Sequence, residues 1–156
     1  MLLKWIMRFF EATRIGSPPL YYVKRSEKAI TPKKGSPGSA GYDLYAAESV
    51  IIPPKSKGNI STDLSIGCPF GTYGRIAPRS GLANKMIDVG GGVVDADYTG
   101  ILKIIIYNFS DDVFVVKEGN RIAQLILENI CTTELEEVDE LPTTVRKNGG
   151  FGSTGV

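Results

Sequence analysis

The chain contains no histidine among its 156 residues. This absence excludes nucleophile systems that depend on a histidine base, such as Ser-His-Asp and Cys-His, and every metal site with histidine ligands. Acid–base chemistry must therefore come from carboxylates, lysine or tyrosine. The length is enough for one domain with a core of ordinary size.

Cysteine is scarce, and the two cysteines lack the spacing of a metal or redox motif. Cys68 and Cys131 lie far apart with no CxxC pair, so neither a disulfide framework nor a zinc site is indicated. We expect reduced thiols in an intracellular protein, either cytoplasmic or nuclear.

An excess of positive charge is missing as well. The 18 lysines and arginines balance 17 aspartates and glutamates, which leaves a net charge of +1 at pH 7. Binding to a nucleic-acid backbone usually requires a clear basic excess, so we expect no nucleic-acid partner.

The first ten residues, MLLKWIMRFF, have the pattern of a short amphipathic helix. The apolar face consists of Leu2, Trp5, Ile6, Phe9 and Phe10. Its apolar runs are far shorter than the ~20 residues of a membrane-spanning helix, so we expect no stable membrane insertion. A basic amphipathic start also suits a mitochondrial or membrane-surface address, but Glu11 argues against a presequence. The favoured alternative is an extension, residues 1–19, that ends at a Gly-Ser-Pro-Pro break.

From residue 20 onward, short apolar runs alternate with turns rich in proline and glycine. This spacing predicts an all-β sandwich or barrel. The expected strands are residues 20–23, 42–46, 49–52, 58–66, 72–77 and 121–128, the last of which has some helix-favouring residues. The one expected helix is residues 80–85, with Ser80 as its cap.

Two apolar runs flank an acidic tip in the segment GGGVVDADYTGILKIIIY, residues 90–107. The pattern predicts a β-hairpin whose second arm is buried on both faces. If the backbone stays extended through Asp95 and Asp97, both carboxylates point to one face, and their repulsion raises the proton affinity of one. Such a carboxylate can act as a general base. A merely polar turn is the alternative.

Two further segments combine charge with apolar surroundings. In AGYDLY, residues 40–45, the lone Asp43 needs a cation, a water or a basic partner, unless it only caps a turn. In PRSGL, residues 78–82, Arg79, Ser80 and free backbone N–H groups at a helix start suit an anion such as phosphate. A loop with a surface arginine is the alternative for this second segment.

Gln124 and the C-terminal tail complete the candidate site material. Gln124 interrupts an apolar run, where a satisfied core amide is commoner than a ligand contact. Residues 146–156, RKNGGFGSTGV, contain G-x-G-x-x-G without the flanking strand and helix of a dinucleotide site, and the chain has no P-loop motif. The tail can fold over a ligand, with Phe151 stacking on a base, although disorder is the default for this composition.

Taken in order, these segments resemble the five motifs of the trimeric dUTPase (deoxyuridine triphosphate nucleotidohydrolase) family. The matches are AGYDLYAA at 40–47, PRSGLA at 78–83, GGGVVDADYTG at 90–100, GNRIAQLI at 119–126 and RKNGGFGSTG at 146–155. The resemblance implies a jelly-roll-like β-barrel of the β-clip type that assembles as a homotrimer. It also implies that residues 20–140 form the barrel and that residues 141–156 form a flexible arm, which closes the active site of a neighbouring subunit.

By the same resemblance, the chain would hydrolyse dUTP to dUMP and pyrophosphate with Mg²⁺ on the triphosphate. Asp95 would deprotonate the water that attacks the α-phosphorus, and Asp43 would hold the ion through water. Tyr98 would pack against the deoxyribose and leave no room for a ribose 2′-hydroxyl. Pairing of the hairpin arms about Tyr98 puts Val94 opposite Lys103, where the backbone would recognise uracil.

The other implied substrate contacts fall into three groups. They are Arg79, Ser80, Gly81 and Gln124 for the phosphates; Gly92, Val93, Val94 and Lys103 for uracil; and Arg146, Phe151, Gly152, Ser153 and Thr154 in the arm. Asn120 stands where family members commonly carry aspartate, which predicts a weaker structural contact.

Two alternatives compete with this interpretation. A dCTP deaminase has the same fold, but the presence of both Tyr98 and Phe151 argues against it. A non-catalytic dUTPase-like protein for nucleotide binding or signalling is the second, and the presence of Asp95, Arg79 and the tail argues against it.

Overall fold

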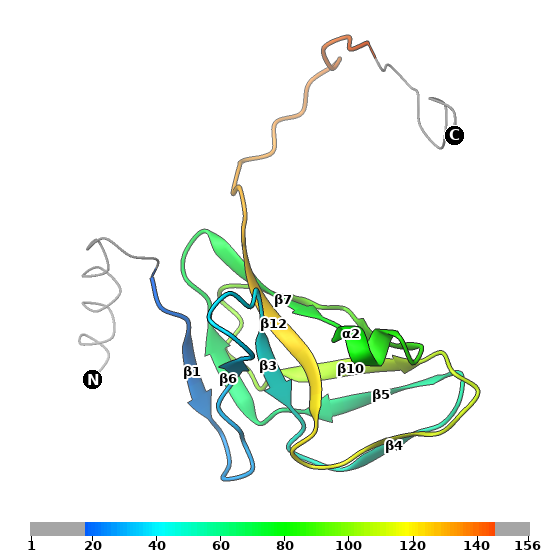
Figure 1. Cartoon of the computed structure of the whole chain (residues 1–156). Helices are drawn as coiled ribbons and strands as arrows, with labels where there is room; N and C mark the ends of the chain where they lie inside the picture. Colours follow the sequence, from blue (N-terminus) through cyan, green and yellow to red (C-terminus); the bar gives the residue numbers. More distant parts are fainter. Residues whose placement is uncertain (1–17, 146–156) are drawn as a thin grey trace.

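The computed structural model describes residues 18–145, which fold almost entirely into strands (Figure 1). The strands are β1 (Tyr21–Lys24), β2 (Lys33–Lys34), β3 (Tyr42–Tyr45), β4 (Val50–Ile52), β5 (Ser56–Ser61), β6 (Leu64–Gly67), β7 (Thr72–Ala77), β8 (Ile87–Gly90), β9 (Val93–Val94), β10 (Lys103–Asn108), β11 (Phe114–Val116) and β12 (Arg121–Asn129). One short helix, α2 (Ser80–Ala83), follows β7. The predicted all-β class is confirmed.

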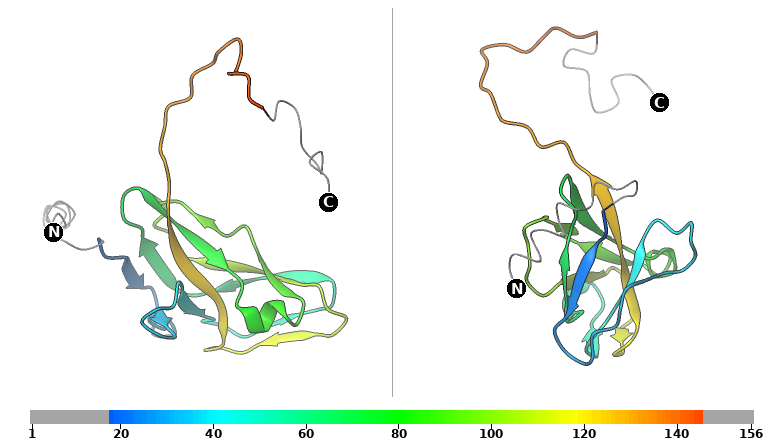
Figure 2. Two further views of the ribbon diagram at one scale, coloured as in Figure 1. Left: turned by 45° about the horizontal axis from the view of Figure 1, so that its top comes forward. Right: turned by 90° about the vertical axis from the view of Figure 1, so that its left-hand side faces the viewer.

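The strands pair antiparallel in four sheets. The largest has the order β2-β3-β12-β7-β9, the second has the order β5-β10-β8, and β1-β6 and β11-β4 form two-stranded ribbons. Figure 2 shows these sheets wrapped around each other, an arrangement that fits the expected jelly-roll-like fold. In the described residues, no helix is long and apolar enough to cross a membrane.

Strand β12 lies at the centre of the largest sheet, with β3 on one edge and β7 on the other. Its alanine, glutamine and leucine residues made a helix a competing interpretation. The segment forms a strand because the ladders with β3 and β7 satisfy its backbone hydrogen-bonding groups. Its Ile122, Ala123 and Leu125 side chains are buried in the core. The predicted strand is therefore confirmed.

Residues 58–66 were expected to be one strand, and this expectation is wrong. The chain turns at Thr62 and Asp63 between β5 and β6, and Asp63 has a left-handed φ of 50°. The Asp63 carboxylate accepts hydrogen bonds from the hydroxyls of Ser26 and Ser61, and these bonds lower the pKa of Asp63. A short side chain that bonds locally favours such a turn over a continuous strand.

The helix was also predicted with the wrong cap. Arg79 occupies the N-cap position, it makes no side-chain capping bond, and Ser80 is the first helical residue. The helix ends at Ala83, and Met86 then adopts a left-handed φ of 61° before β8 begins. The prediction placed the cap one residue late because arginine is an uncommon cap, and it placed the end of the helix two residues too far along the chain.

Strand β10 is covered fully on one face and partly on the other. Ile104 and Ile106 are buried in the core, whereas Ile105 and Tyr107 are half-buried and Lys103 is exposed. The expectation of two buried faces is thus too strong, because β10 pairs with β5 and β8 in a sheet whose second face is only partly packed.

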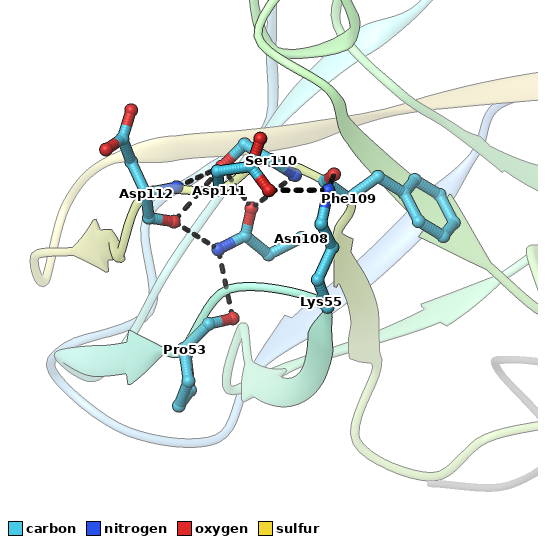
Figure 3. Close-up of polar contacts among 7 residues, drawn as sticks. All are labelled: Pro53, Lys55, Asn108, Phe109, Ser110, Asp111 and Asp112. Atoms are coloured by element: carbon cyan, nitrogen blue, oxygen red, sulfur yellow. Dashed lines mark hydrogen bonds and ion pairs between the residues drawn. The ribbon is translucent and has the colours of Figure 1, made fainter.

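Asn108 ends β10 and joins two turns through a fully buried side chain (Figure 3). Its amide nitrogen donates to the carbonyl oxygens of Ile52, Pro53 and Asp112 at 2.8–3.1 Å. Its side-chain oxygen accepts from the backbone N–H and the hydroxyl of Ser110. One amide therefore fixes the turn after β4 and the turn after β10.

We expect Asn108→Ala to lower the free energy of unfolding by roughly 2–3 kcal/mol, because it leaves buried carbonyl groups without donors. Urea denaturation at fixed protein concentration measures this loss. Asn59→Ala, at an exposed position of β5, is the matched control and should change stability by less than about 0.5 kcal/mol. Equal midpoints for the two variants would contradict the role given to Asn108.

Candidate active site

A polar cavity of about 450 Å³ forms where β3, β12 and the loop after β7 meet. Its lining consists of Gly35, Ser39, Gly41, Asp43, Arg79, Ser80, Gly81, Arg121 and Gln124. The structure thus brings together residues from three segments that the sequence singled out, namely 40–47, 78–83 and 119–126. We call this space the phosphate cavity.

Asp43 lies between two arginines in the phosphate cavity. Its carboxylate accepts from Arg79 Nε at 3.0 Å and from Arg121 Nη1 at 3.2 Å. The sequence predicted a cation, a water or a basic partner for Asp43. The structure gives it two basic partners. Two guanidinium groups around one carboxylate leave a positive charge in the cavity, which favours an anionic ligand.

Arg121 was not among the predicted site residues. It belongs to the GNRIAQLI segment, but a strand-starting arginine with half of its side chain exposed looks like an ordinary surface residue. Its position became informative only through the pairing of β12 with β3, which places Arg121 opposite Tyr45, near Asp43. The signal that could have identified Arg121 as a site residue was its charge within the matched segment 119–126.

Gln124 is a satisfied amide that also faces the phosphate cavity. Its Nε2 donates to the carbonyl oxygen of Pro78 at 2.9 Å, so the amide is satisfied, and the side chain also lines the cavity. Gly41 faces it so closely that a Cβ would lie 2.6 Å from Gln124 Oε1. A side chain at position 41 would therefore have to displace the Gln124 amide.

A second cavity of about 270 Å³ lies within the predicted hairpin, and we call it the hairpin cavity. It is lined by Gly90, Gly91, Gly92, Val93, Val94, Asp95, Tyr98, Leu102, Lys103 and Ile105. Five sequence-predicted residues, Gly92, Val93, Val94, Tyr98 and Lys103, contribute to this lining together with Asp95.

The two arms of the hairpin diverge beyond Gly90. The ladder between β8 and β10 ends at the pair of Gly90 with Ile105, and β9 pairs with β7, where Val94 lies opposite Gly74. The predicted pairing of Val94 with Lys103 is therefore wrong. Gly91 and Gly92 turn the first arm away through φ values of 72° and 76°, and the divergence opens the hairpin cavity.

The carboxylates of the tip are not arranged as an extended strand would arrange them. A turn covers residues 96–97, and the backbone N–H of Tyr98 donates to the carbonyl oxygen of Asp95 at 3.1 Å. The condition for Asp95 and Asp97 to share one face is therefore not met. Both residues are exposed, and of the two only Asp95 lines the hairpin cavity.

Tyr98 is held at the rim of the hairpin cavity. Its hydroxyl donates to the carbonyl oxygen of Ile101 at 3.0 Å, and the ring lies over Gly100, where a Cβ would come within 2.7 Å of the hydroxyl. This contact fixes the ring across its own loop. The predicted arm contacts Arg146, Phe151, Gly152, Ser153 and Thr154 lie outside the described residues.

The two cavities together define a class of protein. A cationic polar cavity suits phosphates, and a separate cavity with a glycine-rich wall, an aromatic ring and a carboxylate suits a small planar ligand. These features are those of an all-β protein that acts on a nucleotide.

Comparison with known proteins identifies the family. A sequence model described as dUTPase matches residues 27–155. A deoxyuridine 5'-triphosphate nucleotidohydrolase of Arabidopsis thaliana is 59% identical over 140 residues, which cover 88% of this chain and 84% of that protein. The chain belongs to the dUTPase family.

Solved structures agree with this assignment. The dUTPase of Staphylococcus bacteriophage 80alpha, solved with dUPNHPP, has a TM-score of 0.84 and 31% identity and covers 90% of this chain and 100% of its own. A mutant dUTPase from phage phi11 of S. aureus, which coordinates a structural Mg(II) ion, has a TM-score of 0.75 and 29% identity over 80% of this chain and 99% of its own.

We expect Gly41→Ala to weaken the binding of inorganic pyrophosphate about tenfold, which is a loss of ~1.4 kcal/mol, because the new methyl group displaces Gln124. Titration calorimetry measures the affinity. Gly38→Ala in the same loop is the matched control, since nothing lies within 4 Å of a Cβ there. Equal affinities for the two variants would show that Gln124 does not shape the anion site.

Proposed function

We propose that this chain hydrolyses dUTP to dUMP and pyrophosphate and is thus a dUTP diphosphatase. The observation that carries the proposal is the pair of arginines around Asp43 in a chain that also places a carboxylate, Asp95, in the hairpin cavity. The first feature suits the triphosphate, and the second supplies a base for water. The family match gives the substrate.

The phosphate cavity binds and orients the triphosphate. Arg79 and Arg121 neutralise the charge that develops on the departing pyrophosphate, and the N–H groups around Ser80 and Gly81 donate to the phosphate oxygens. The Asp43 pairs are half-exposed on the Arg121 side, so they contribute little to stability. Their main effect is to hold the two guanidinium planes in place for the ligand.

The hairpin cavity binds the nucleoside and positions the base. Backbone groups of Gly92 to Val94 and of Lys103 line the open space between the arms, where they can pair with the edge of uracil. Tyr98, fixed on its own loop, packs against the deoxyribose and excludes a 2′-hydroxyl. Asp95 takes the proton of the water that attacks the α-phosphorus.

The proposal includes Mg²⁺ bound through the triphosphate. The described residues contain no group of three carboxylate, cysteine or histidine side chains that could hold a metal ion, and Asp43 is already paired with two guanidinium groups. This donor set fits an ion whose direct ligands are phosphate oxygens and water, with Asp43 bonded to that water. When bound, the ion neutralises phosphate charge.

The proposal also includes a homotrimer whose active sites combine residues of different subunits. The phosphate cavity and the hairpin cavity share no lining residue, so a site between subunits can join one cavity to the other. Residues 130–145 extend away from the sheets (Figures 1 and 2), and Leu135 and Leu141 are 100% and 83% exposed. Burying such side chains on another subunit is favourable.

The domain division follows from the same proposal. Residues 20–140 form the β domain, and residues 141–156 form the arm that closes over a neighbouring site. Of the extension, residues 1–19, the structure describes only Pro18 and Pro19, so the expected amphipathic helix lies outside the described residues. Cys68 and Cys131 are both free thiols, which supports an intracellular location.

The activity is tested by pyrophosphate release from dUTP, dCTP, dTTP and UTP at equal concentration with Mg²⁺. We expect release from dUTP alone. Asp95→Asn should lower turnover at least about 1,000-fold while dUTP affinity stays within about threefold, because the amide keeps the shape but cannot take a proton. Asp97→Asn, in the same turn, is the matched control and should retain turnover. A folded protein inactive on all four nucleotides would favour the non-catalytic binding protein.

Deletion of residues 146–156 should remove most activity and leave the trimer intact, because the arm closes the site but lies beyond the β domain. Native mass measurement gives the subunit number, and the pyrophosphate assay gives the activity. A fully active truncated protein would show that the arm has no part in the reaction.

A further inference from the structure

The outer wall of the hairpin cavity is a segment without regular structure. Residues 99–102 connect Tyr98 to β10 and belong to no strand, yet Leu102 is buried and lines the cavity next to Lys103. A wall of this kind needs support from elsewhere in the fold, because it lacks a ladder of its own.

Thr62 supplies that support through the turn between β5 and β6. Its hydroxyl donates to the carbonyl oxygen of Leu102 at 2.8 Å, and its backbone N–H donates to the same oxygen at 3.1 Å. The N–H of Leu102 donates in turn to the carbonyl oxygen of Leu64 at 2.7 Å. Both backbone groups of Leu102 are therefore fixed by one turn.

The Thr62 side chain requires a hydroxyl at this position. While the hydroxyl donates to Leu102, it also accepts from the backbone N–H of Leu64 at 3.2 Å, and the residue is fully buried. Only a group that donates and accepts can satisfy both neighbours. An isosteric valine keeps the packing of Thr62 but loses the side-chain hydrogen bonds to Leu102 and Leu64. The substitution therefore separates the packing of this side chain from its hydrogen bonding.

Arg25 supports the other end of the wall. Its Nη2 donates to the carbonyl oxygen of Thr99 at 3.4 Å, while its Nε donates to the buried Ser65 hydroxyl at 2.8 Å. Its backbone N–H donates to the carbonyl oxygen of Asp63 at 2.8 Å, which ties it to the turn that carries Thr62. The segment is thus held at Thr99 by Arg25 and at Leu102 by Thr62, and both supports belong to the turn between β5 and β6 or are bonded to it.

We propose that Thr62 is a positioning residue for the nucleoside, with Arg25 as a second support for the same wall. Both lie outside the five matched segments. The inference rests on the proposed function, because it assigns the hairpin cavity to the base and sugar. A loosened wall moves the backbone of Leu102 and Lys103 away from the bound base, while Asp95 on the opposite arm keeps its place.

The test compares three variants in dUTP hydrolysis. Thr62→Val should raise the KM for dUTP about five- to tenfold, with kcat within about twofold, since loss of a binding contact acts on KM. Thr62→Ser should restore the KM to within about twofold of the unaltered protein. Thr72→Val is a close control, because the Thr72 hydroxyl and N–H both donate to one carbonyl oxygen, that of Pro69, away from both cavities.

Hydrogen exchange of the Leu102 amide tests the wall without any reaction. Exchange should be about tenfold faster in Thr62→Val than in Thr72→Val. An equal KM for these two variants, a failure of Thr62→Ser to restore the KM, or unchanged exchange at Leu102 would each overturn the inference. If the unaltered protein released no pyrophosphate from dUTP, the proposed function would fail, and the exchange result would still decide whether Thr62 holds the wall.

A second substitution covers the case in which Thr62→Val does not fold. Arg25 is exposed, so Arg25→Met should fold and raise the KM for dUTP about two- to threefold. Lys57→Met on the exposed side of β5 is its charge-matched control. A KM that rises equally in both variants would show a general charge effect and would overturn the part given to Arg25.

Discussion

The position of one residue, Gln124, organises the phosphate cavity. In strand β12 it lies opposite Asp43 of β3 on one side and opposite Ala77 of β7 on the other. A shift of either ladder by one residue would point the neighbouring side chains to the opposite face. The double register therefore brings an acid, an amide and the arginine loop to one place, although they come from three distant parts of the chain.

Much of this fold follows from local sequence. The short apolar runs and the proline and glycine turns between them correctly indicated strands such as β1, β3, β4, β7 and β12, because each run needs only its own residues to be recognised. The split between β5 and β6 could not be predicted in this way, since Thr62 and Asp63 gain their turn through hydrogen bonds to serines and to Leu102. Such partners become visible only after folding.

The candidate site divides in the same way. The residue types alone pointed to an anion at Arg79, to proton transfer at Asp95, and to a cation, a water or a basic partner at Asp43. Which partner Asp43 has depended on the ladders. The course of β9 is the clearest case: two glycines with left-handed φ direct Val94 to β7 in place of the facing arm.

The turn before β12 contains Asn120 where family members commonly carry aspartate. The Asn120 side-chain oxygen accepts a hydrogen bond from the backbone N–H of Lys117 at 2.9 Å, so an amide oxygen closes this turn.

The ion pairs of Asp43 also bear on the energetics of ligand exchange. Long arginine side chains lose rotamer freedom when they bind an anion, and each immobilised side chain of this kind costs about 0.5–1.5 kcal/mol on association. Here Asp43 restricts both guanidinium groups in the absence of a ligand, so part of that entropy is already lost during folding. Preorganisation by Asp43 therefore lowers the entropic cost of binding the phosphates, whereas repulsion between its carboxylate and the anion weakens that binding and favours release.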